Sequence, residues 1–372
     1  MKNLGFGMMR LPVLNGDPTD FDYDQLNRMV DAFLEAGYTY FDTSYVYHNG
    51  KSEEATRRAL VERHPRDSFT VATKFPTFSM VPEGEVDGLF ESQLANLGVD
   101  YIDYYLLHNI QNVYYDGFDG TGGIVKETHL FDHARRWKED GKVRHLGISF
   151  HSSAKLLDRV LSEHPEVEFV QLQVNWADWD NANTQSRKCV ETARKHGLPV
   201  IIMEPVRGGT LANPPQPVAE ILHEGNPDAT YVQWALRFAW GVEGLITVLS
   251  GMSSLEQMQQ NLDTWKSYVP LSEDERATLE RAQRKLDEML DNPCTSCQYC
   301  MKACPKSIKI AQIMEALNRA AIYGDDNGKN WYGFNASSGK ASDCIQCYSC
   351  EAACPQHIAI VGKLEEAADK FE

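Results

Sequence analysis

The sequence has no long apolar run and little positive charge, and each shortage excludes a class of protein. No stretch of about 18 consecutive apolar residues is present, so we expect no membrane-spanning helix. The 372 residues include 53 acidic and only 36 basic side chains, for a formal net charge of −17. This balance repels nucleic-acid phosphates and anionic lipids, so neither nucleic acid nor membrane is an expected partner. The first residues also lack the apolar core of a secretory signal, which predicts a cytoplasmic protein.

Cysteine is scarce through most of the chain and abundant at its end. Cys189 is the only cysteine among the first 293 residues, and its helical context favours a small buried side chain over a nucleophile. The other eight cysteines crowd the last 79 residues. This shift predicts one domain over residues 1–268, then a linker helix and a second domain over residues 269–372. The linker helix should begin at Ser272, which forms a capping-box pattern with Glu275.

The cysteine-rich end contains one motif twice. Both copies read C-x2-C-x2-C-x3-C-P, from Cys294 to Pro305 and from Cys344 to Pro355. Bacterial two-cluster ferredoxins hold [4Fe–4S] clusters with this run, and the fourth cysteine of each run binds the other cluster. The predicted ligand sets are Cys294, Cys297, Cys300 and Cys354 for one cluster, and Cys344, Cys347, Cys350 and Cys304 for the other. Two zinc sites or four disulfide bonds are the alternatives, but a reducing cytoplasm disfavours disulfides and zinc rarely uses this spacing.

The rest of the chain alternates short β-branched runs with amphipathic helical stretches. Eight runs are typical of strands: Leu4–Gly7, Tyr38–Asp42, Phe69–Lys74, Tyr101–His108, Val143–Ser149, Phe169–Val174, Val200–Met203 and Leu245–Leu249. Strands that alternate with helices pair in parallel through right-handed crossovers. Eight such units over about 265 residues favour a closed (β/α)8 barrel. The predicted fold class is therefore α/β, a TIM barrel followed by a helical, ferredoxin-like iron–sulfur domain.

Three ionisable residues end consecutive predicted strands. Asp42 ends the second strand, Lys74 the third and His108 the fourth, while Tyr47 follows Asp42 by five residues. The carboxyl ends of barrel strands form one face, where the chemistry of such proteins is concentrated. Alone, each residue has an ordinary explanation: a helix cap, a solvated lysine, a buried histidine or a packed tyrosine. Together at one face they predict an active site.

These residues lie in a segment that resembles a known family. The run Asp42-Thr43-Ser44-Tyr45-Val46-Tyr47, with Gly50, Ser52 and Glu53 after it, is similar to the aldo-keto reductase signature. Lys74 and His108 complete that family's Asp-Tyr-Lys-His tetrad. With the Gly7–Pro12 opening and the cysteine-rich end, the whole chain resembles the ferredoxin-fused branch of the family. The resemblance implies an NAD(P)-dependent oxidoreductase that reduces a small aldehyde or ketone, or oxidises the alcohol.

The resemblance also implies a role for each member of the tetrad. A phenol with a pKa near 10 is a poor acid or base at neutral pH unless its neighbours change that value. We expect the Lys74 ammonium to favour the phenolate form of Tyr47, and Asp42 to orient the lysine and keep it charged. Neutral His108 would hold the substrate oxygen. Tyr47 would then exchange a proton with the substrate as the nicotinamide transfers hydride.

Cofactor contacts carry over from the family by position. The implied residues are Gly7, Met8, Asp42, Ser149, Gln171, Met203, Arg207, Gly208, Gly209, Gly251, Gln257 and Asn261. Among these, Ser149 and Gln171 are the expected contacts to the nicotinamide amide. Arg207 is the candidate partner of the pyrophosphate.

This sequence departs from the family at three of the cofactor positions. The asparagine that often follows the amide-binding serine is replaced by Phe150, with His151 next, so one amide hydrogen bond is lost or replaced. Met203 stands where many relatives stack an aromatic ring on the nicotinamide. The segment 251–257 offers no cation for a 2′-phosphate, which leaves NADP and NAD both open.

One chemical mismatch leaves a second function open. A nicotinamide gives two electrons as hydride, whereas each iron–sulfur cluster accepts one. The chain is therefore either a carbonyl reductase whose clusters are structural, regulatory or linked to an outside carrier, or an electron-transfer protein whose barrel binds nucleotide without turnover. The intact tetrad favours the reductase. A redox partner protein is a further expectation, because the acidic surface suits a basic partner.

Overall fold

The computed structural model of this chain describes residues 4–117, 122–182, 184–294, 299–354 and 356–372. The chain divides into two compact units, Met1–Gly208 with Val232–Leu271, and Gly209–Tyr231 with Ser272–Glu372. The division predicted between residues 268 and 269 stays a prediction. The second unit also includes residues 209–231, which the sequence analysis assigned to the barrel domain.

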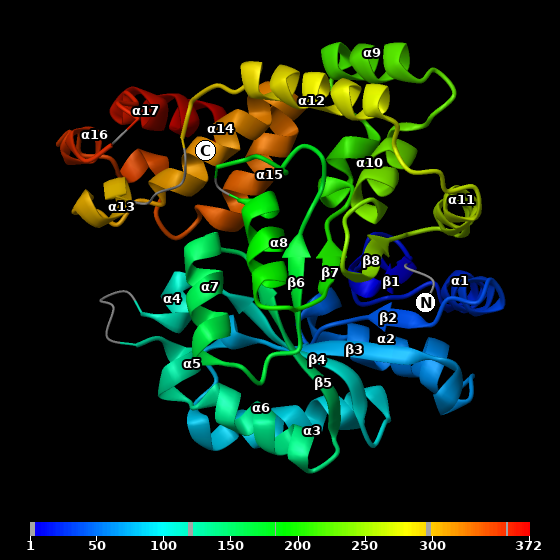
Figure 1. The fold of residues 1–372 in the computed structure, drawn as a ribbon. Helices are drawn as coiled ribbons and strands as arrows, with labels where there is room; N and C mark the ends of the chain where they lie inside the picture. The colour runs from blue at the N-terminus through cyan, green and yellow to red at the C-terminus, as the bar shows by residue number, and fades with distance from the viewer. Residues whose placement is uncertain (1–3, 118–121, 183, 295–298, 355) are drawn as a thin grey trace. The chain divides into compact units, whose positions relative to one another are not determined.

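The first unit is built on a closed barrel of parallel strands that pair in sequence order (Figure 1). The strands are β1 (Leu4–Gly7), β2 (Tyr40–Asp42), β3 (Thr70–Phe75), β4 (Ile102–Ile110), β5 (Val143–Phe150), β6 (Phe169–Gln173), β7 (Val200–Met203) and β8 (Leu245–Gly251). Strand β1 pairs with β8 and closes the barrel. The predicted (β/α)8 architecture is therefore confirmed.

Helices of the first unit cover the barrel because each has one apolar side. They are α1 (Tyr23–Glu35), α2 (Ser52–Thr56), α3 (Val86–Leu97), α4 (Asn112–Tyr115), α5 (Ile124–Glu127), α6 (Leu130–Glu139), α7 (Ala154–Glu163), α8 (Ser186–Lys195), α10 (Tyr231–Trp240) and α11 (Leu255–Lys266). In α7, the buried residues Leu156, Leu157, Val160 and Leu161 recur at the spacing of one helix face. Ser153 begins that helix by accepting the Leu156 N–H at 3.3 Å.

The inside of the barrel is filled by side chains from alternate strand positions. Six of them form a separate buried cluster: Tyr40, Ala72, Leu106, Phe169, Ile201 and Leu249. Gly147 on β5 makes room for the largest of these rings, since a Cβ at Gly147 would lie 2.4 Å from Phe169 Cζ. The interior is thus a packed core, and ligands have access only to the ends of the strands.

The second unit is helical. It comprises α9 (Gln216–Gly225), α12 (Glu273–Glu288), α13 (Tyr299–Ala303), α14 (Ile310–Tyr323), α15 (Asp325–Asn335), α16 (Ser349–Ala352) and α17 (Ile360–Phe371). The predicted capping box is confirmed, with Ser272 and Glu275 at the start of α12. Helix α9 packs closely on α12, where a Cβ at Gly225 would lie 2.5 Å from Thr278 Cγ2. In the described part of the chain, no helix has both the length and the apolar character needed to cross a bilayer.

Candidate active site and iron–sulfur centre

The predicted site residues share one inward-facing register of the barrel. Successive strand residues point to opposite faces, so the residue two places after an inward side chain also faces inward. Two places after the six interior side chains come, in order, Asp42, Lys74, His108, Gln171, Met203 and Gly251. These residues form the next layer toward the carboxyl ends of the strands. Three tetrad members and several implied cofactor residues are therefore brought together by strand periodicity.

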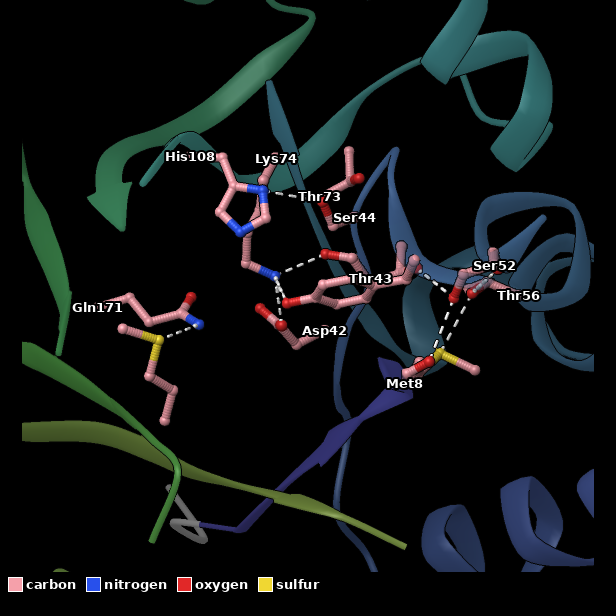
Figure 2. Close-up of polar contacts among 12 residues, drawn as sticks. Met8, Asp42, Thr43, Ser44, Ser52, Thr56, Thr73, Lys74, His108 and Gln171 are labelled. Carbon is pink, nitrogen blue, oxygen red and sulfur yellow. Dashed lines mark hydrogen bonds and ion pairs between the residues drawn. The ribbon is translucent and has the colours of Figure 1, made fainter. Parts of the chain in front are cut away.

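Lys74 is the centre of the contacts within the tetrad (Figure 2). Its Nζ lies 2.5 Å from Asp42 Oδ1 and donates to the Thr43 carbonyl oxygen at 2.7 Å. The same nitrogen donates to Tyr47 Oη at 3.3 Å. The Lys74 side chain is 0% exposed and that of Asp42 is 3% exposed. A buried cation thus joins a carboxylate to a phenol.

Burial and charge oppose each other at these three groups. Burial by itself would lower the pKa of Lys74, but Asp42 and Tyr47 raise that pKa above its usual value, so the ammonium stays charged. Burial raises the pKa of Asp42, and the Lys74 charge opposes this rise. Burial also raises the pKa of Tyr47, and the Lys74 charge only partly offsets it. The sequence analysis expected the phenolate to be favoured; the lysine acts in that direction, but burial outweighs it.

His108 lies beside the phenol as a neutral ring. Burial, then the charges of Lys74 and His151, hold the pKa of His108 well below its usual value. Its Nδ1 lies 3.1 Å from Ser44 Oγ, so a serine hydroxyl that donates there selects the tautomer with the proton on Nε2. The ring stands edge-on to that of Tyr47, with centroids 6.1 Å apart. Phe78 is a further neighbour, with a centroid distance of 5.3 Å to His108, and sequence reasoning missed it.

Ser149 and Gln171 carry unsatisfied polar atoms at the same face. They are register partners on β5 and β6, and both are buried. Among the described residues, neither Ser149 Oγ nor Gln171 Oε1 has a hydrogen-bond partner. Leaving a buried polar atom unpaired costs about 1–3 kcal/mol, so two such neighbours indicate a polar ligand. The pair fits the amide of a nicotinamide, and Gln171 Nε2 also contacts Met203 Sδ at 3.6 Å.

Met8 contributes less than the resemblance implied. Its side chain is fully buried, and its sulfur accepts the Thr56 hydroxyl at 3.2 Å (Figure 2). Its carbonyl oxygen accepts the Ser52 hydroxyl, also at 3.2 Å. The Met8 side chain therefore packs against α2, and only the backbone around Gly7 and Met8 is left to meet a cofactor.

Arg207 already has a protein partner. Its Nε lies 3.1 Å from Asp178 Oδ1, and both side chains are largely buried. The same carboxylate accepts from Gln173 Nε2 and Asn175 Nδ2 at 2.8 Å each. The sequence analysis did not foresee Asp178, and a pyrophosphate at Arg207 would share the guanidinium with it. Gly208 and Gly209 follow with φ of +65° and +100°, backbone conformations that favour glycine.

The residues after β8 form the start of α11. Gln257 Oε1 accepts the Ser253 N–H at 2.8 Å, and the Gln257 N–H donates to Ser254 Oγ at 3.2 Å. Gln257 is thus engaged in capping the helix. Asn261 donates to the Gln257 carbonyl oxygen at 2.8 Å, while its buried Oδ1 lacks a partner among the described residues. Asn261 is the better placed of the two to meet a ligand.

Glu53 takes part in a buried network behind Lys74 that sequence reasoning missed. Its Oε1 accepts from Thr73 Oγ1 at 2.7 Å and Gln93 Nε2 at 2.8 Å, and its Oε2 accepts from Asn96 Nδ2 at 3.1 Å. Gln93 Nε2 also lies 3.1 Å from the Lys74 carbonyl oxygen. All three groups donate to the Glu53 carboxyl, whose pKa burial raises, and the network fixes the strand that carries Lys74. The available signal was Gln93, a polar residue within the apolar stripe of α3.

One predicted set of cluster ligands borders a single cavity. Cys304, Cys344, Cys347 and Cys350 line a small, partly open hollow together with apolar side chains. The Gln346 N–H lies 3.4 Å from Cys344 Sγ, and hydrogen bonds from Ser349 lower the pKa of Cys347. Four thiols at one hollow, with N–H groups directed at sulfur, suit a [4Fe–4S] cluster.

The other predicted set is described in part. Cys294, Cys300 and Cys354 belong to the described residues, whereas Cys297 lies outside them. Asn318 on α14 is buried, and its amide accepts the Asn292 N–H at 2.8 Å and donates to the Asn292 carbonyl oxygen at 3.0 Å. Asn292 Oδ1 in turn accepts the Cys294 N–H at 3.3 Å, which fixes that end of the motif. None of the described cysteines forms a disulfide bond.

Family models match both parts of the chain. The model described as the aldo/keto reductase family matches residues 3–284, and that of a 4Fe-4S dicluster domain matches residues 293–359. An aldo-keto reductase from Mycolicibacterium vanbaalenii is 28% identical over 276 residues, which cover 73% of this chain and 88% of the relative. One from Mycolicibacterium smegmatis is 29% identical over 281 residues, which cover 72% and 86%. The match to residues 293–359 confirms the predicted iron–sulfur domain.

Solved structures share the barrel fold. An aldo-keto reductase from Bacillus halodurans in its holo form has a TM-score of 0.60 at 23% identity, and the match covers 75% of this chain and 91% of that one. An aldo-keto reductase from Klebsiella pneumoniae in complex with NADPH has a TM-score of 0.59 at 21% identity, covering 75% and 90%. At these identities the likeness supports the fold.

Proposed function

The chain belongs to the aldo/keto reductase family, and from this premise we propose that it reduces a small aldehyde or ketone, or oxidises the alcohol, with NADPH or NADH. The observation that carries this proposal is the buried Lys74 ammonium shared between Asp42 and Tyr47. Burying an ion pair seldom stabilises a fold relative to apolar side chains of similar size. A charge kept at that depth beside a phenol therefore indicates a chemical role.

Tyr47 is the proposed general acid. Burial raises the pKa of its phenol, so the hydroxyl is protonated at neutral pH, and the Lys74 charge, which acts to lower that pKa, makes the proton easier to donate. As the proton moves from Tyr47 Oη to the substrate oxygen, the Lys74 ammonium at 3.3 Å stabilises the phenolate left behind. A bound nicotinamide supplies or accepts the hydride. Asp42 keeps Lys74 charged, and in the reverse direction the phenolate takes the proton back.

Neutral His108 is proposed to hold the substrate oxygen. With Nδ1 directed at Ser44, its Nε2 carries the hydrogen and can donate to that oxygen as negative charge develops. A protonated imidazole there would repel Lys74, and the lowered pKa of His108 avoids this conflict. The histidine thus orients the carbonyl toward the phenol without competing for the proton.

Ser149 and Gln171 are proposed to bind the nicotinamide amide, because they are neighbours on adjacent strands and their buried oxygens have no partner within the described residues. Asn261 Oδ1, which likewise has no partner in the described part of the chain, is proposed to contact the adenine. NADPH is the first cofactor to test, since the Klebsiella neighbour was solved with it. NADH is the comparison, because the segment 251–257 provides no cation for a 2′-phosphate.

We propose that the C-terminal domain holds two [4Fe–4S] clusters with the ligand sets given in the sequence analysis. The cavity lined by Cys304, Cys344, Cys347 and Cys350 supports one of them. Eight cysteines in a short segment that are proposed to bind clusters rather than form disulfide bonds suit a reducing compartment, which supports a cytoplasmic location. A separate redox partner protein would exchange electrons with clusters that the barrel chemistry does not use.

The decisive experiment compares Tyr47→Phe with Tyr45→Phe, a control on the same segment. The cluster-loaded proteins are assayed without oxygen for NADPH oxidation with a panel of aldehydes, ketones and sugars, and for NADPH affinity by fluorescence. Loss of a general acid lowers turnover by about 10²–10⁴-fold, so Tyr47→Phe should do so with nearly unchanged affinity. Retained turnover in Tyr47→Phe would refute the assignment. A wild-type protein that binds nucleotide but reduces none of the panel would favour the electron-transfer alternative.

A further inference from the structure

A second histidine lies at the strand-end face of the barrel, outside the tetrad and the proposed cofactor contacts. His151 directly follows β5, two places after Ser149. Because side chains two places apart on a strand face the same way, the inward register of Gly147 and Ser149 continues to His151. The His151 N–H donates to the Ile110 carbonyl oxygen at 3.4 Å, so its backbone still follows β4. His151 therefore extends the inward-facing residues one layer beyond Ser149.

The His151 ring can be reached by a ligand. The residue is exposed, and within the described ranges its imidazole forms no hydrogen bond or ion pair. Desolvation by the surrounding protein, and then the Lys74 charge, lower the pKa of His151 to about 4, so the ring is neutral at neutral pH. A neutral imidazole has one N–H donor and one nitrogen acceptor, and in the described structure both are available to a ligand.

His151 and an aromatic ring come from opposite sides of the strand that carries His108. This strand, β4, pairs with β3 on one side and with β5 on the other. Phe78 belongs to the segment after β3, and its ring centroid lies 5.3 Å from that of His108. Tyr114 continues this aromatic side, with a centroid distance of 6.4 Å to Phe78. From the β5 side, the charge of His151 acts on His108.

These neighbours give the proposed substrate position two unlike sides. A carbonyl oxygen held by neutral His108 has aromatic rings toward β3 and a hydrogen-bonding imidazole toward β5. Ser149 and Gln171, the proposed amide-binding pair, lie one layer deeper than His151. The ring is therefore placed toward the open end of the site, where a substituent of the substrate lies, rather than at the level of the nicotinamide amide.

We propose that His151 is a specificity-determining residue that forms a hydrogen bond with a hydroxyl group on the carbon next to the substrate carbonyl. The expected substrate class is a small α-hydroxy aldehyde or ketone. This inference rests on the proposed function, because it concerns the substrate of the same site. A hydroxyl both donates and accepts, so it pairs with either tautomer of the ring. An apolar substituent would displace water from the ring without replacing its hydrogen bond, and would bind more weakly.

The test compares hydroxyacetone with butan-2-one, in which a methyl group replaces the hydroxyl. The measured quantity is the ratio of kcat/KM for hydroxyacetone to that for butan-2-one, with NADPH and the full, cluster-loaded chain kept without oxygen. A hydrogen bond between neutral groups contributes about 0.5–1.5 kcal/mol, so His151→Leu should lower this ratio by about 2- to 13-fold. His151→Gln should recover part of the ratio, because a side-chain amide also donates and accepts.

A binding measurement tests the same contact without turnover. With NADP⁺ bound no hydride is available to the ketone, so ligand-detected NMR can give the dissociation constants of both ketones. Their ratio should change by the same factor in His151→Leu. The NADPH affinity of each variant is measured in parallel by fluorescence. Weaker NADPH binding in His151→Leu with an unchanged ketone ratio would assign the ring to the cofactor and overturn the inference.

His145→Leu is the matched control. His145 lies on β5 in the same register as His151 but toward the amino end of the strand, where its Nδ1 lies 3.6 Å from Glu168 Oε1. An unchanged ratio in His151→Leu, an equal fall in His145→Leu, or a wild type that binds neither ketone overturns the inference. Failure of the two proposals can be told apart. A wild type that binds the ketones with the expected ratio but reduces neither sinks only the proposed function, and carbonyl turnover with an unchanged ratio sinks only this inference.

Discussion

Removing one member of the buried Asp42–Lys74 pair should destabilise the barrel more than removing both. The two side chains are 3% and 0% exposed and lie 2.5 Å apart. Lys74→Met leaves a buried carboxylate with no cation beside it. Asp42→Asn leaves a buried ammonium whose Nζ meets neutral groups in place of a carboxylate, among them the Thr43 carbonyl oxygen and the Tyr47 hydroxyl. The double variant leaves no charge at the position.

The expected size of the effect follows from the depth of the pair. Breaking a buried pair from one side costs about 3–5 kcal/mol, whereas replacing both members is often neutral or stabilising. In a domain of this size, 1 kcal/mol shifts Tm by about 2–4 °C. Each single variant should therefore lose about 6–20 °C in Tm. The double variant should lie closer to the wild type than either single variant.

The two single variants should respond to pH in opposite directions. Burial already raises the pKa of Asp42, and loss of the Lys74 charge raises it further. A carboxyl whose pKa is raised by folding destabilises the fold above its folded pKa, so the deficit of Lys74→Met should shrink as pH falls toward about 4. Without the Asp42 charge, burial lowers the pKa of Lys74. A lysine whose pKa is lowered by folding destabilises the fold at pH values below that pKa. The loss of stability in Asp42→Asn should therefore shrink in alkaline solution.

Thermal unfolding of the cluster-loaded chain measures these differences. Trp176 and Trp234 are fully buried, so tryptophan fluorescence without oxygen, at one heating rate, reports the unfolding. Glu54→Gln is the control, because it breaks the exposed Lys51–Glu54 pair, and such surface pairs contribute about 0–1 kcal/mol. If the double variant loses as much as the two single variants combined, the buried pair is not a coupled unit and the reasoning fails.

Four further outcomes are expected. Glu53→Gln should lower Tm and turnover, because it weakens the hydrogen bonds that hold the strand carrying Lys74. It should leave NADPH affinity unchanged, because Glu53 is not among the proposed cofactor contacts. Carbonyl reduction should stay constant through neutral pH and fall only in alkaline solution, since burial raises the pKa of Tyr47; a decline that begins near neutrality contradicts this. Cys350→Ser should lower iron and acid-labile sulfide by about half, while Cys189→Ser, at a buried thiol on α8, should leave both unchanged. NADPH alone should not bleach the cluster absorbance of the wild type, whereas a chemical reductant should.

Strand periodicity made most of the active site predictable from sequence. Asp42, Lys74 and His108 could be placed together because each ends a predicted strand and the carboxyl ends of barrel strands share one face. The side-chain period of two then determines that Gln171 and Met203 face the same interior. No distance information was needed for these residues, because barrel closure supplies the contacts between strands.

Loop geometry and burial could not be predicted in this way. Arg207 pairs with Asp178 only because the segments after β6 and β7 fold toward one another, and no local pattern reports that. The direction of the Tyr47 pKa was also missed, because it depends on how deeply the phenol is buried rather than on which charge lies beside it.

The residues that the proposed carbonyl chemistry requires all come from one of the two units. The tetrad and the proposed amide-binding pair lie within residues 42–171 of the unit built on the barrel. A hydride transfer moves both electrons in one step, so it leaves no single electron for a one-electron centre to accept. The proposed barrel reaction therefore needs no electrons from the cysteine-rich domain. We accordingly expect carbonyl turnover and the redox state of the proposed clusters to be separate properties, so that a failure to observe one is no argument against the other.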